Sequence, residues 1–303
     1  MGKTKQQTVK DCLINNGVII VMFILVIYTG LTSNNFFTSN NLMNILMNMS
    51  SRLVIALGIA GCVITAGCDL SAGRMIGFGA CISGMLLQRM DYSGKFFPDM
   101  QPLNVFVVAL IAMLVCAAFG TVTGFFIAYL NVPPFIATLA MMEIVYGIGL
   151  IVTNATPLGG YVEQYTNVSN GKFLGINYLI WIAIIVAAIS WFIFNMTRHG
   201  KYMYAIGGNP QAAEVAGVPV KATLILIYMK AAAMYGLAGF MLGAKAGGAS
   251  VQTGYGYEME AIAACTIGGV SVTGGRGKVS SAIIGVAVFE LLKVALQYLG
   301  MNA

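Results

Sequence analysis

The feature that most constrains this chain is a series of apolar segments, each close to the length that a lipid bilayer requires. A membrane-spanning helix needs about 20 mostly apolar residues. With their flanking residues the candidate spans are 17–31, 103–130, 135–152, 178–194, 224–244 and 279–299. Only 9% of the residues are charged, whereas soluble domains carry roughly 25%. We therefore predict one all-α, polytopic membrane domain over residues 1–303, with about eight or nine transmembrane or re-entrant helices.

Basic residues give the predicted membrane protein an orientation. Three lysines lie within residues 1–12, and the first apolar run lacks the cleavage site of a signal peptide. Residues 1–12 are therefore predicted to be a cytoplasmic tail. Two shorter apolar runs, 53–67 and 75–87, together with the four candidate spans before residue 197 make six crossings, which return the segment 197–221 to the same side. In this segment the basic residues outnumber the acidic residues by three to one. The net charge of the chain is +6. In a membrane protein such an excess of Lys and Arg usually lies in cytoplasmic loops, so it does not indicate nucleic-acid binding.

Polar residues interrupt the apolar pattern between residues 53 and 87. The apolar runs 53–67 and 75–87 are each short, and Asp69, Ser71 and Arg74 lie between them. Charges and irregular backbone are tolerated at membrane depth only inside protein or along a watery cavity. The interruption is therefore either a broken helix that lines a translocation path or a cytoplasmic turn with solvated charges.

A second interruption precedes the run 261–270. This run is too short for a full span and fits a re-entrant segment. Glu258 and Glu260 lie directly before it. Together the two interruptions predict broken helices near the path of a transported solute.

Three further patterns predict how helices lie or pack. Residues 32–49 are rich in Asn and Ser with apolar residues between them, which favours an interfacial or surface helix. Gly120 and Gly124 have the spacing that lets a neighbouring helix approach closely. Glu290 and Lys293 are three residues apart in the last apolar run and can pair on one helix face.

The segment 197–221 contains the signals of a short helix. Asn209 suits the N-cap, Pro210 suits the first helical position, and Gly217 is placed to end the helix. A helix of about two turns is not stable by itself in water and needs a surface to dock against. The alternative is an ordinary connecting loop.

The sequence lacks the residue patterns of the common enzyme classes. Gly277 and Lys278 resemble the end of a phosphate-binding loop, but Val272 and Val279 occupy positions that need Gly and Ser or Thr. His199 is the single histidine, and the cysteines show no C-x-x-C spacing. We predict no catalytic residue, no metal site and no cofactor, so energy for transport must come from a partner or from an ion gradient. The candidate ion-coupling carboxylates are Asp69, Glu143 and Glu258.

Three motifs resemble one transporter family. They are A-I-G-G-N-P-Q-A-A-E-V-A-G-V-P-V at 205–220, I-T-A-G-C-D-L-S-A-G-R at 64–74, and G-Y-G-Y-E-M-E-A-I-A-A-C-T-I-G-G-V-S-V-T-G-G-R-G at 254–277. These resemble motifs of the sugar-importing ATP-binding-cassette permeases, the ribose, galactose and xylose class. The resemblance extends from about Asn40 to Gly300. The D-L-S-A-G-R form is most similar to members that import galactose and methyl galactosides.

The resemblance implies a permease subunit of a monosaccharide importer in the bacterial cytoplasmic membrane, with galactose or methyl galactoside as substrate. Implied partners are an ATPase subunit, an extracytoplasmic sugar-binding protein, a second copy of the permease and membrane lipid. The residues implied to couple to the ATPase are Gly207, Gly208, Asn209, Pro210, Ala213, Glu214 and Gly217. Those expected along the translocation path are Asp69, Ser71, Arg74, Glu258 and Glu260.

Other possibilities remain open at this point. The substrate of such an importer could be another sugar, as in the ribose and xylose members, or the chain could be a stand-alone ion-coupled secondary transporter. A membrane-embedded enzyme has almost no residues to support it. Members of the class continue with one more hydrophobic helix and a basic tail, so we expect either a truncated chain or a variant that ends early.

Overall fold

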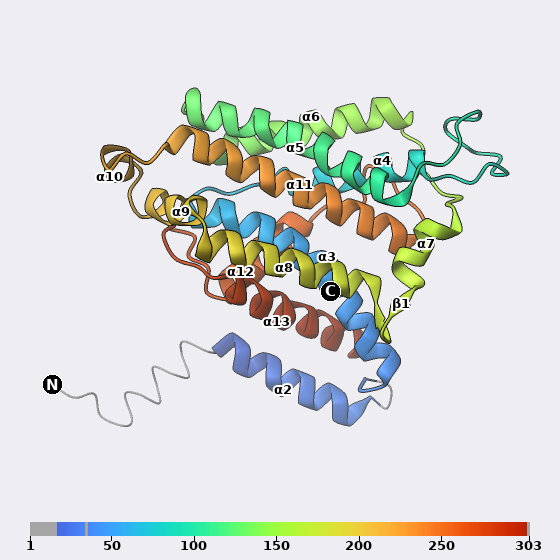
Figure 1. Cartoon of the computed structure of the whole chain (residues 1–303). Coiled ribbons are helices and arrows are strands. Elements are labelled where there is room, and N and C mark those ends of the chain that lie inside the picture. The colour runs from blue at the N-terminus through green and yellow to red at the C-terminus, as the bar shows by residue number, and fades with distance from the viewer. Residues whose placement is uncertain (1–16, 34–35, 302–303) are drawn as a thin grey trace.

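The computed structural model describes residues 17–33 and 36–301, and these form a bundle of helices (Figure 1). Six helices are long and apolar enough to cross a membrane: α3 (Ser39–Ile64), α5 (Val105–Tyr129), α6 (Pro134–Thr153), α8 (Tyr178–Met196), α11 (Val220–Ala246) and α13 (Val279–Tyr298). The bundle confirms the predicted all-α polytopic fold. The predicted tail 1–12 lies outside the described residues.

Shorter elements complete the bundle. Three shorter helices pack with the six candidate spans: α2 (Gly17–Thr32), α4 (Ala72–Leu86) and α12 (Tyr257–Ile267). Spans and shorter bundle helices together number nine within the described part of the chain. At one end of the bundle lie α9 (Arg198–Gly208) and α10 (Pro210–Val215). At the other end lie α7 (Glu163–Asn170) and a hairpin of β1 (Lys172–Phe173) paired antiparallel with β2 (Ile176–Asn177). We call these the α10 end and the α7 end (Figure 1).

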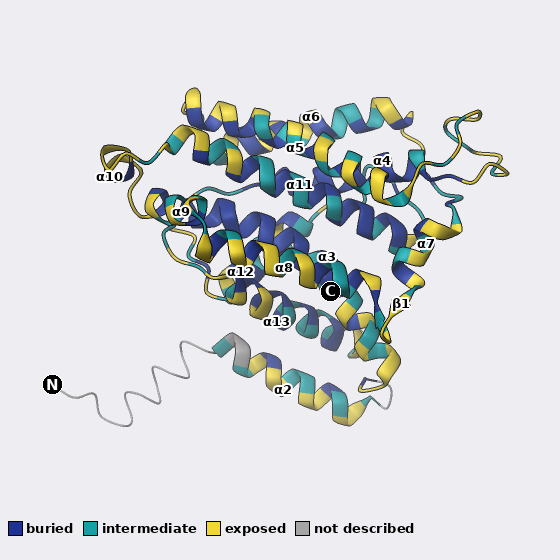
Figure 2. Ribbon diagram, in the orientation of Figure 1, coloured by how far each residue is buried: buried dark blue, intermediate teal, exposed yellow. Residues whose placement is uncertain are grey.

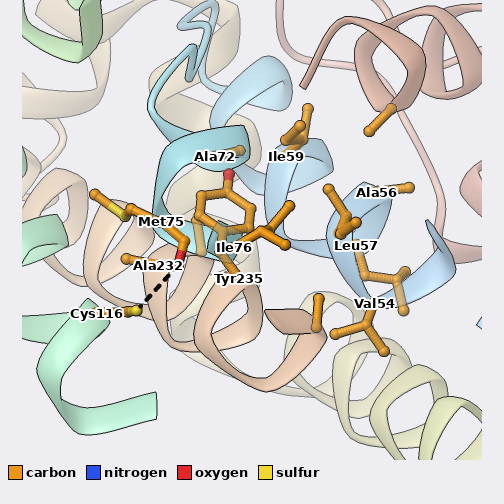
Figure 3. Packing of buried hydrophobic residues seen from close by; sticks show 14 of the residues in the cluster. Val54, Ala56, Leu57, Ile59, Ala72, Met75, Ile76, Cys116, Ala232 and Tyr235 are labelled. Atoms are coloured by element: carbon orange, nitrogen blue, oxygen red, sulfur yellow. Dashed lines mark hydrogen bonds between the residues drawn. The ribbon is translucent and has the colours of Figure 1, made fainter. Parts of the chain in front are cut away.

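α3 is the central helix of the bundle. Every residue from Leu53 to Ile64 is buried, and the helix contacts α8, α11, α12 and α13. A helix that is apolar on all sides is stable only where other elements surround it. In Figure 3, Leu57 of α3, Ile76 of α4 and Tyr235 of α11 belong to one buried cluster. Figure 2 shows the exposed residues on the outward faces of α5, α6 and α8, as expected for faces that meet lipid.

The prediction of a separate surface helix over residues 32–49 is wrong. α3 begins at Ser39, where the Thr38 side chain accepts a hydrogen bond from the backbone nitrogen of Asn41 (3.4 Å), and it continues unbroken into the apolar run. The Asn and Ser residues occupy its first turns near the α7 end (Figure 1), where polar side chains lie near the surface. The apolar run that begins at Leu53, too short by itself to cross a membrane, thus belongs to the second half of a helix of 26 residues.

The predicted close packing at Gly120 and Gly124 of α5 is confirmed. A Cβ atom at Gly120 would lie 2.4 Å from the carbonyl oxygen of Tyr228 in α11. A Cβ atom at Gly124 would lie 2.7 Å from Cα of Ile225 in the same helix. Both positions therefore require glycine, because the backbones of α5 and α11 touch there.

Candidate translocation and coupling sites

Two helices of the bundle begin after irregular segments of the chain, α4 at a buried start and α12 at a start that is partly exposed. α4 follows residues 65–71 and α12 follows residues 247–256, and neither connecting segment is helical. The two helix starts face each other, because a Cβ atom at Gly73 would lie 2.0 Å from Oε2 of Glu258. One turn further along α4, a Cβ atom at Gly77 would lie 2.8 Å from a carbonyl oxygen of the 247–256 segment. Surrounding protein allows such irregular backbone to exist within a membrane.

Asp69 is buried just before α4, and the chain beside it holds its carboxylate. Oδ1 accepts hydrogen bonds from the backbone nitrogen of Ser71 (3.0 Å) and from the Ser71 hydroxyl (2.5 Å). The hydroxyl of Tyr235 lies beside the same carboxyl group. Only 1% of the Asp69 surface is exposed, so the alternative of a turn with a solvated Asp69 is wrong.

Arg74 is held between two aromatic rings. Its Nη1 donates to Oε1 of Gln252 (2.7 Å) and to the carbonyl oxygen of Val251 (3.3 Å). Its guanidinium carbon lies 4.0 Å from the ring centroid of Tyr146 and 4.3 Å from that of Tyr255. Such stacking is strongest where water is excluded, and 9% of the Arg74 surface is exposed.

Glu258 lies at the start of α12, opposite the start of α4. Its side chain is buried, and among the described residues its Oε2 has no hydrogen-bond partner. The positive charge of Arg74 attracts the Glu258 carboxylate, but the two side chains form no ion pair within 4 Å in the described structure. The starts of α4 and α12 therefore place Arg74 and Glu258 in one polar site.

Glu260 takes part in a separate network of charges. Its carboxylate pairs with Nε of Arg52 (3.0 Å) and with Nζ of Lys293 (2.8 Å). Arg52 also pairs with Glu290, with 2.9 Å between Nη1 and Oε2. Glu290 and Lys293 are close enough to attract each other electrostatically, as their spacing predicts, but the ion pairs within 4 Å join Glu290 to Arg52 and Lys293 to Glu260. These ion pairs join α3, α12 and α13, and thereby hold the short helix α12 in place.

The short helix predicted after Asn209 is confirmed as α10. The Asn209 side chain accepts a hydrogen bond from the backbone nitrogen of Ala212 (3.0 Å), and Pro210 is the first helical residue. The helix ends at Val215, and Gly217 has a φ of +82°, a conformation that favours glycine. The preceding helix α9 is capped by Thr197, whose hydroxyl accepts from the backbone nitrogen of Gly200 (3.2 Å).

Gly207 lies at the contact of α9 with two other segments. A Cβ atom at Gly207 would lie 1.8 Å from the carbonyl oxygen of Ile64 and 2.5 Å from the backbone nitrogen of Gly275. That nitrogen donates to the carbonyl oxygen of Ile64 (2.8 Å). The hydroxyl of Tyr204 donates to the carbonyl oxygen of Gly277 (2.8 Å). α9 is thus in direct contact with the end of α3 and with the loop that follows α12.

The remaining residues expected to couple to an ATPase divide by exposure. Gly207 and Ala213 are buried and face the rest of the protein. The exposed members of the set are Gly208, Asn209, Pro210, Glu214 and Gly217. Val215 is 91% exposed, an unusual environment for a valine, and sequence reasoning had not selected it. Its position beside Glu214 on a two-turn helix could have identified it.

Sequence reasoning also missed the groups that surround Arg74. Tyr146 belongs to α6, and Gln252 lies in the irregular segment before α12. Tyr and Gln occur throughout membrane helices and loops, so only the fold reveals their contacts. Tyr255 had a signal, because it lies within the motif at 254–277.

Comparison with known proteins agrees with the resemblance that the three sequence motifs show. Residues 41–303 match the family described as branched-chain amino acid transport system / permease component. The chain is 40% identical to the galactose/methyl galactoside import permease protein MglC of Escherichia coli (strain K12), over 94% of this chain and 87% of that protein. The chain is 41% identical to MglC of Haemophilus influenzae, over 96% of this chain and 89% of that protein.

A ribose permease is also related. The ribose import permease protein RbsC of Escherichia coli (strain K12) is 32% identical, over 94% of this chain and 86% of that protein. No solved structure matches the chain. The predicted resemblance to sugar import permeases is thus confirmed over almost the whole sequence. The chain belongs to the family of branched-chain amino acid transport system permease components.

Proposed function

We propose that this chain is the membrane-spanning permease subunit of an ATP-driven importer for galactose or methyl galactoside in the bacterial cytoplasmic membrane. The observation that carries the proposal is the identity of 40% to an MglC protein over 94% of the chain. The identity to the ribose permease is lower, at 32%, which favours galactose over ribose as the substrate.

The charges of the connecting segments support an orientation for the permease. At the α10 end, the segments 197–221 and 268–278 carry five basic residues and one acidic residue. At the α7 end, the segments 88–104 and 154–177 carry three of each. Cytoplasmic loops of membrane proteins hold the excess of Lys and Arg. The α10 end therefore faces the cytoplasm, and an extracytoplasmic sugar-binding protein delivers its sugar at the α7 end.

The polar site at the starts of α4 and α12 suits a sugar. The rings of Tyr146 and Tyr255 each turn one face toward Arg74 and leave the other face for the carbon side of a sugar ring, while Arg74 and Glu258 supply a hydrogen-bond donor and an acceptor beside them. Tyr255 is 59% exposed and Met259 of α12 is 58% exposed. A single chain thus leaves this region open on one side, and a second copy of the permease closes it in a homodimer.

Coupling to the partner ATPase uses both faces of the α9–α10 segment. The ATPase docks on the exposed residues of α10, which include Glu214 and Val215. The buried face carries the movement onward through Gly207 to the end of α3 and to Gly275. Those two positions lead directly into the segments that flank α4 and α12, so nucleotide-driven movement opens or closes the path between them.

A second candidate function is ion-coupled transport by this chain alone. The observation that favours it is the burial of two carboxylates, Asp69 and Glu258, beside the interrupted helices. Intramembrane carboxylates of this kind serve as ion or proton sites in many carriers.

Reconstitution into vesicles separates these functions. The chain is inserted with or without its ATPase and sugar-binding protein, and uptake of labelled galactose and ribose is measured with ATP or with an imposed proton or sodium gradient. The importer requires uptake of galactose only when both partners and ATP are present. Gradient-driven uptake by the chain alone would establish the carrier instead, and ATP-dependent uptake of ribose but not galactose would change the substrate.

A further inference from the structure

A groove on the lipid-facing side of the bundle lies between α5 and α8. Its volume is about 650 Å³. Val105 and Ala109 of α5 form one wall, Ile182 and Ile185 of α8 form the other, and Leu237 and Phe240 of α11 form the floor. In Figure 1, α11 is visible between α5 and α8. Ile185 is 55% exposed, so the groove opens away from the protein.

The groove changes character at the α7 end. There its lining includes Asn104, Gln164 and Asn167, together with the interfacial aromatic residues Tyr178 and Trp181. Tyr and Trp are concentrated where the hydrocarbon of a membrane meets its headgroups. The groove is therefore apolar along the helices and polar at the level of a membrane surface, which is the profile of a lipid molecule.

A second, polar hollow continues the groove around α7. Its volume is about 540 Å³, and it shares Gln164 and Asn167 with the groove. Its charged residues are Arg89 and Glu163, one of each sign. Arg89 has Asp91 nearby at 3.5 Å, but both side chains are more than half exposed, and such surface pairs are weak. A group bearing one negative and one positive charge is therefore the best electrostatic match to the hollow.

We propose that the groove and the hollow together bind a glycerophospholipid with a zwitterionic, ammonium-bearing headgroup. The acyl chains lie along α11 between α5 and α8. The glycerol ester groups reach Gln164 and Asn167, the phosphate reaches Arg89, and the ammonium group reaches Glu163. The placement of this lipid in the outer leaflet rests on the proposed orientation of the permease, whereas the binding itself does not. None of these residues belongs to the polar site around Arg74.

Native mass spectrometry of the purified full chain in detergent tests the proposal. The protein is titrated with dioleoyl phosphatidylethanolamine and, separately, with dioleoyl phosphatidylglycerol, whose headgroup has no ammonium group. We expect phosphatidylethanolamine to bind more tightly. Arg89→Gln weakens its binding by about tenfold, as expected for the loss of a hydrogen bond to a charged group. Glu163→Gln removes the preference between the two lipids.

A matched pair of tryptophan variants tests the acyl-chain groove. Ala109→Trp fills the groove, whereas Ala118→Trp changes an exposed alanine of the same helix that does not line it. Loss of lipid binding in the first variant alone, with unchanged unfolding temperatures in both, supports the proposal. Equal binding of the two lipids by the unmodified protein, or undiminished binding by both Ala109→Trp and Arg89→Gln, would overturn it. Binding of phosphatidylglycerol in preference would assign the site to an anionic lipid instead.

Discussion

Gly207 of α9 and Ile64 of α3 meet backbone to backbone at the α10 end. The space between them is too small for any side chain, because a Cβ atom at position 207 would lie 1.8 Å from the Ile64 carbonyl oxygen. The same oxygen accepts the hydrogen bond from Gly275 (2.8 Å). Contacts made through backbone atoms alone leave no flexible side chain to absorb a displacement, so a movement of α9 shifts both neighbours.

The first prediction concerns this contact. Gly207→Ala should destabilise the protein by about 1–3 kcal/mol, the usual cost of adding volume to a filled space. It should also lower ATP-driven uptake. Gly208→Ala is the matched control for stability, because a Cβ atom there meets nothing within 4 Å. Unfolding temperature in detergent and uptake by vesicles measure the two effects, and equal unfolding temperatures of the two variants would contradict the tight contact.

The second prediction concerns the charge network around α12. Arg52→Met removes the partner shared by Glu260 and Glu290, which leaves their carboxylates partly uncompensated. Breaking a buried pair in this way costs about 3–5 kcal/mol. The unfolding temperature should fall clearly below that of Lys201→Met, which changes an exposed residue of α9. An Arg52→Met protein as stable as this control would show that the network does not hold α12.

The third prediction concerns Asp69. Asp69→Ala removes the acceptor for both hydrogen bonds from Ser71 and should lower uptake without changing co-purification with the ATPase. Asp69→Asn keeps an oxygen that can accept those bonds, so recovery of uptake in this variant would show that the turn geometry matters rather than the charge. Normal uptake by Asp69→Ala would remove Asp69 from the path.

The fourth prediction concerns Arg74. Arg74→Lys keeps the positive charge but loses the planar group that lies between Tyr146 and Tyr255. Uptake should fall by about tenfold, since stacking and hydrogen bonding at a desolvated site are worth about 1.4 kcal/mol or more. Uptake is measured at several sugar concentrations, so that weaker sugar binding is separated from slower transport. A lysine variant with unchanged uptake would show that charge alone is required.

The fifth prediction concerns acid stability. Burial, together with the charge of nearby Lys230, lowers the pKa of His199 from 6.5 to about 4. The folded protein therefore holds His199 neutral, while the unfolded chain takes up a proton below pH about 6.5. The free energy of unfolding therefore contains the full contribution of neutral His199 above pH about 6.5, and this contribution is lost as the pH falls toward 4. The unfolding temperature of His199→Gln should fall less between pH 7 and pH 5 than that of the unmodified protein, and an equal fall would contradict the shift.

Local patterns in the sequence were sufficient to predict the spans and α10. Hydropathy identifies a membrane helix because the bilayer imposes its length, and Asn209 with Pro210 identifies a helix start because both act on their own backbone. The same reasoning missed the first half of α3. Its Asn and Ser residues lower the local hydropathy, although the helix continues through them to the surface.

Contacts between distant segments could not be predicted in this way. The sequence places Glu290 three residues from Lys293, yet Arg52 and Glu260 are the partners that the bundle brings to them. Similarly, nothing local connects Arg74 with Gln252, which lies 178 positions later in the chain. The motif at 254–277 indicated that the region matters, but only the fold shows which of its side chains face α4.

The opposed starts of α4 and α12 also determine the electrostatic potential inside the bundle. The N-terminus of a helix carries a partial charge of roughly +0.5 from its unpaired amide groups. Two such ends converge near the guanidinium of Arg74, and the buried carboxylates of Asp69 and Glu258 lie at the same two helix starts. The negative charge of these two groups offsets the positive charge of Arg74 and of the two helix ends. The interior of the bundle thus keeps a balanced set of charges, where a single uncompensated charge would be costly.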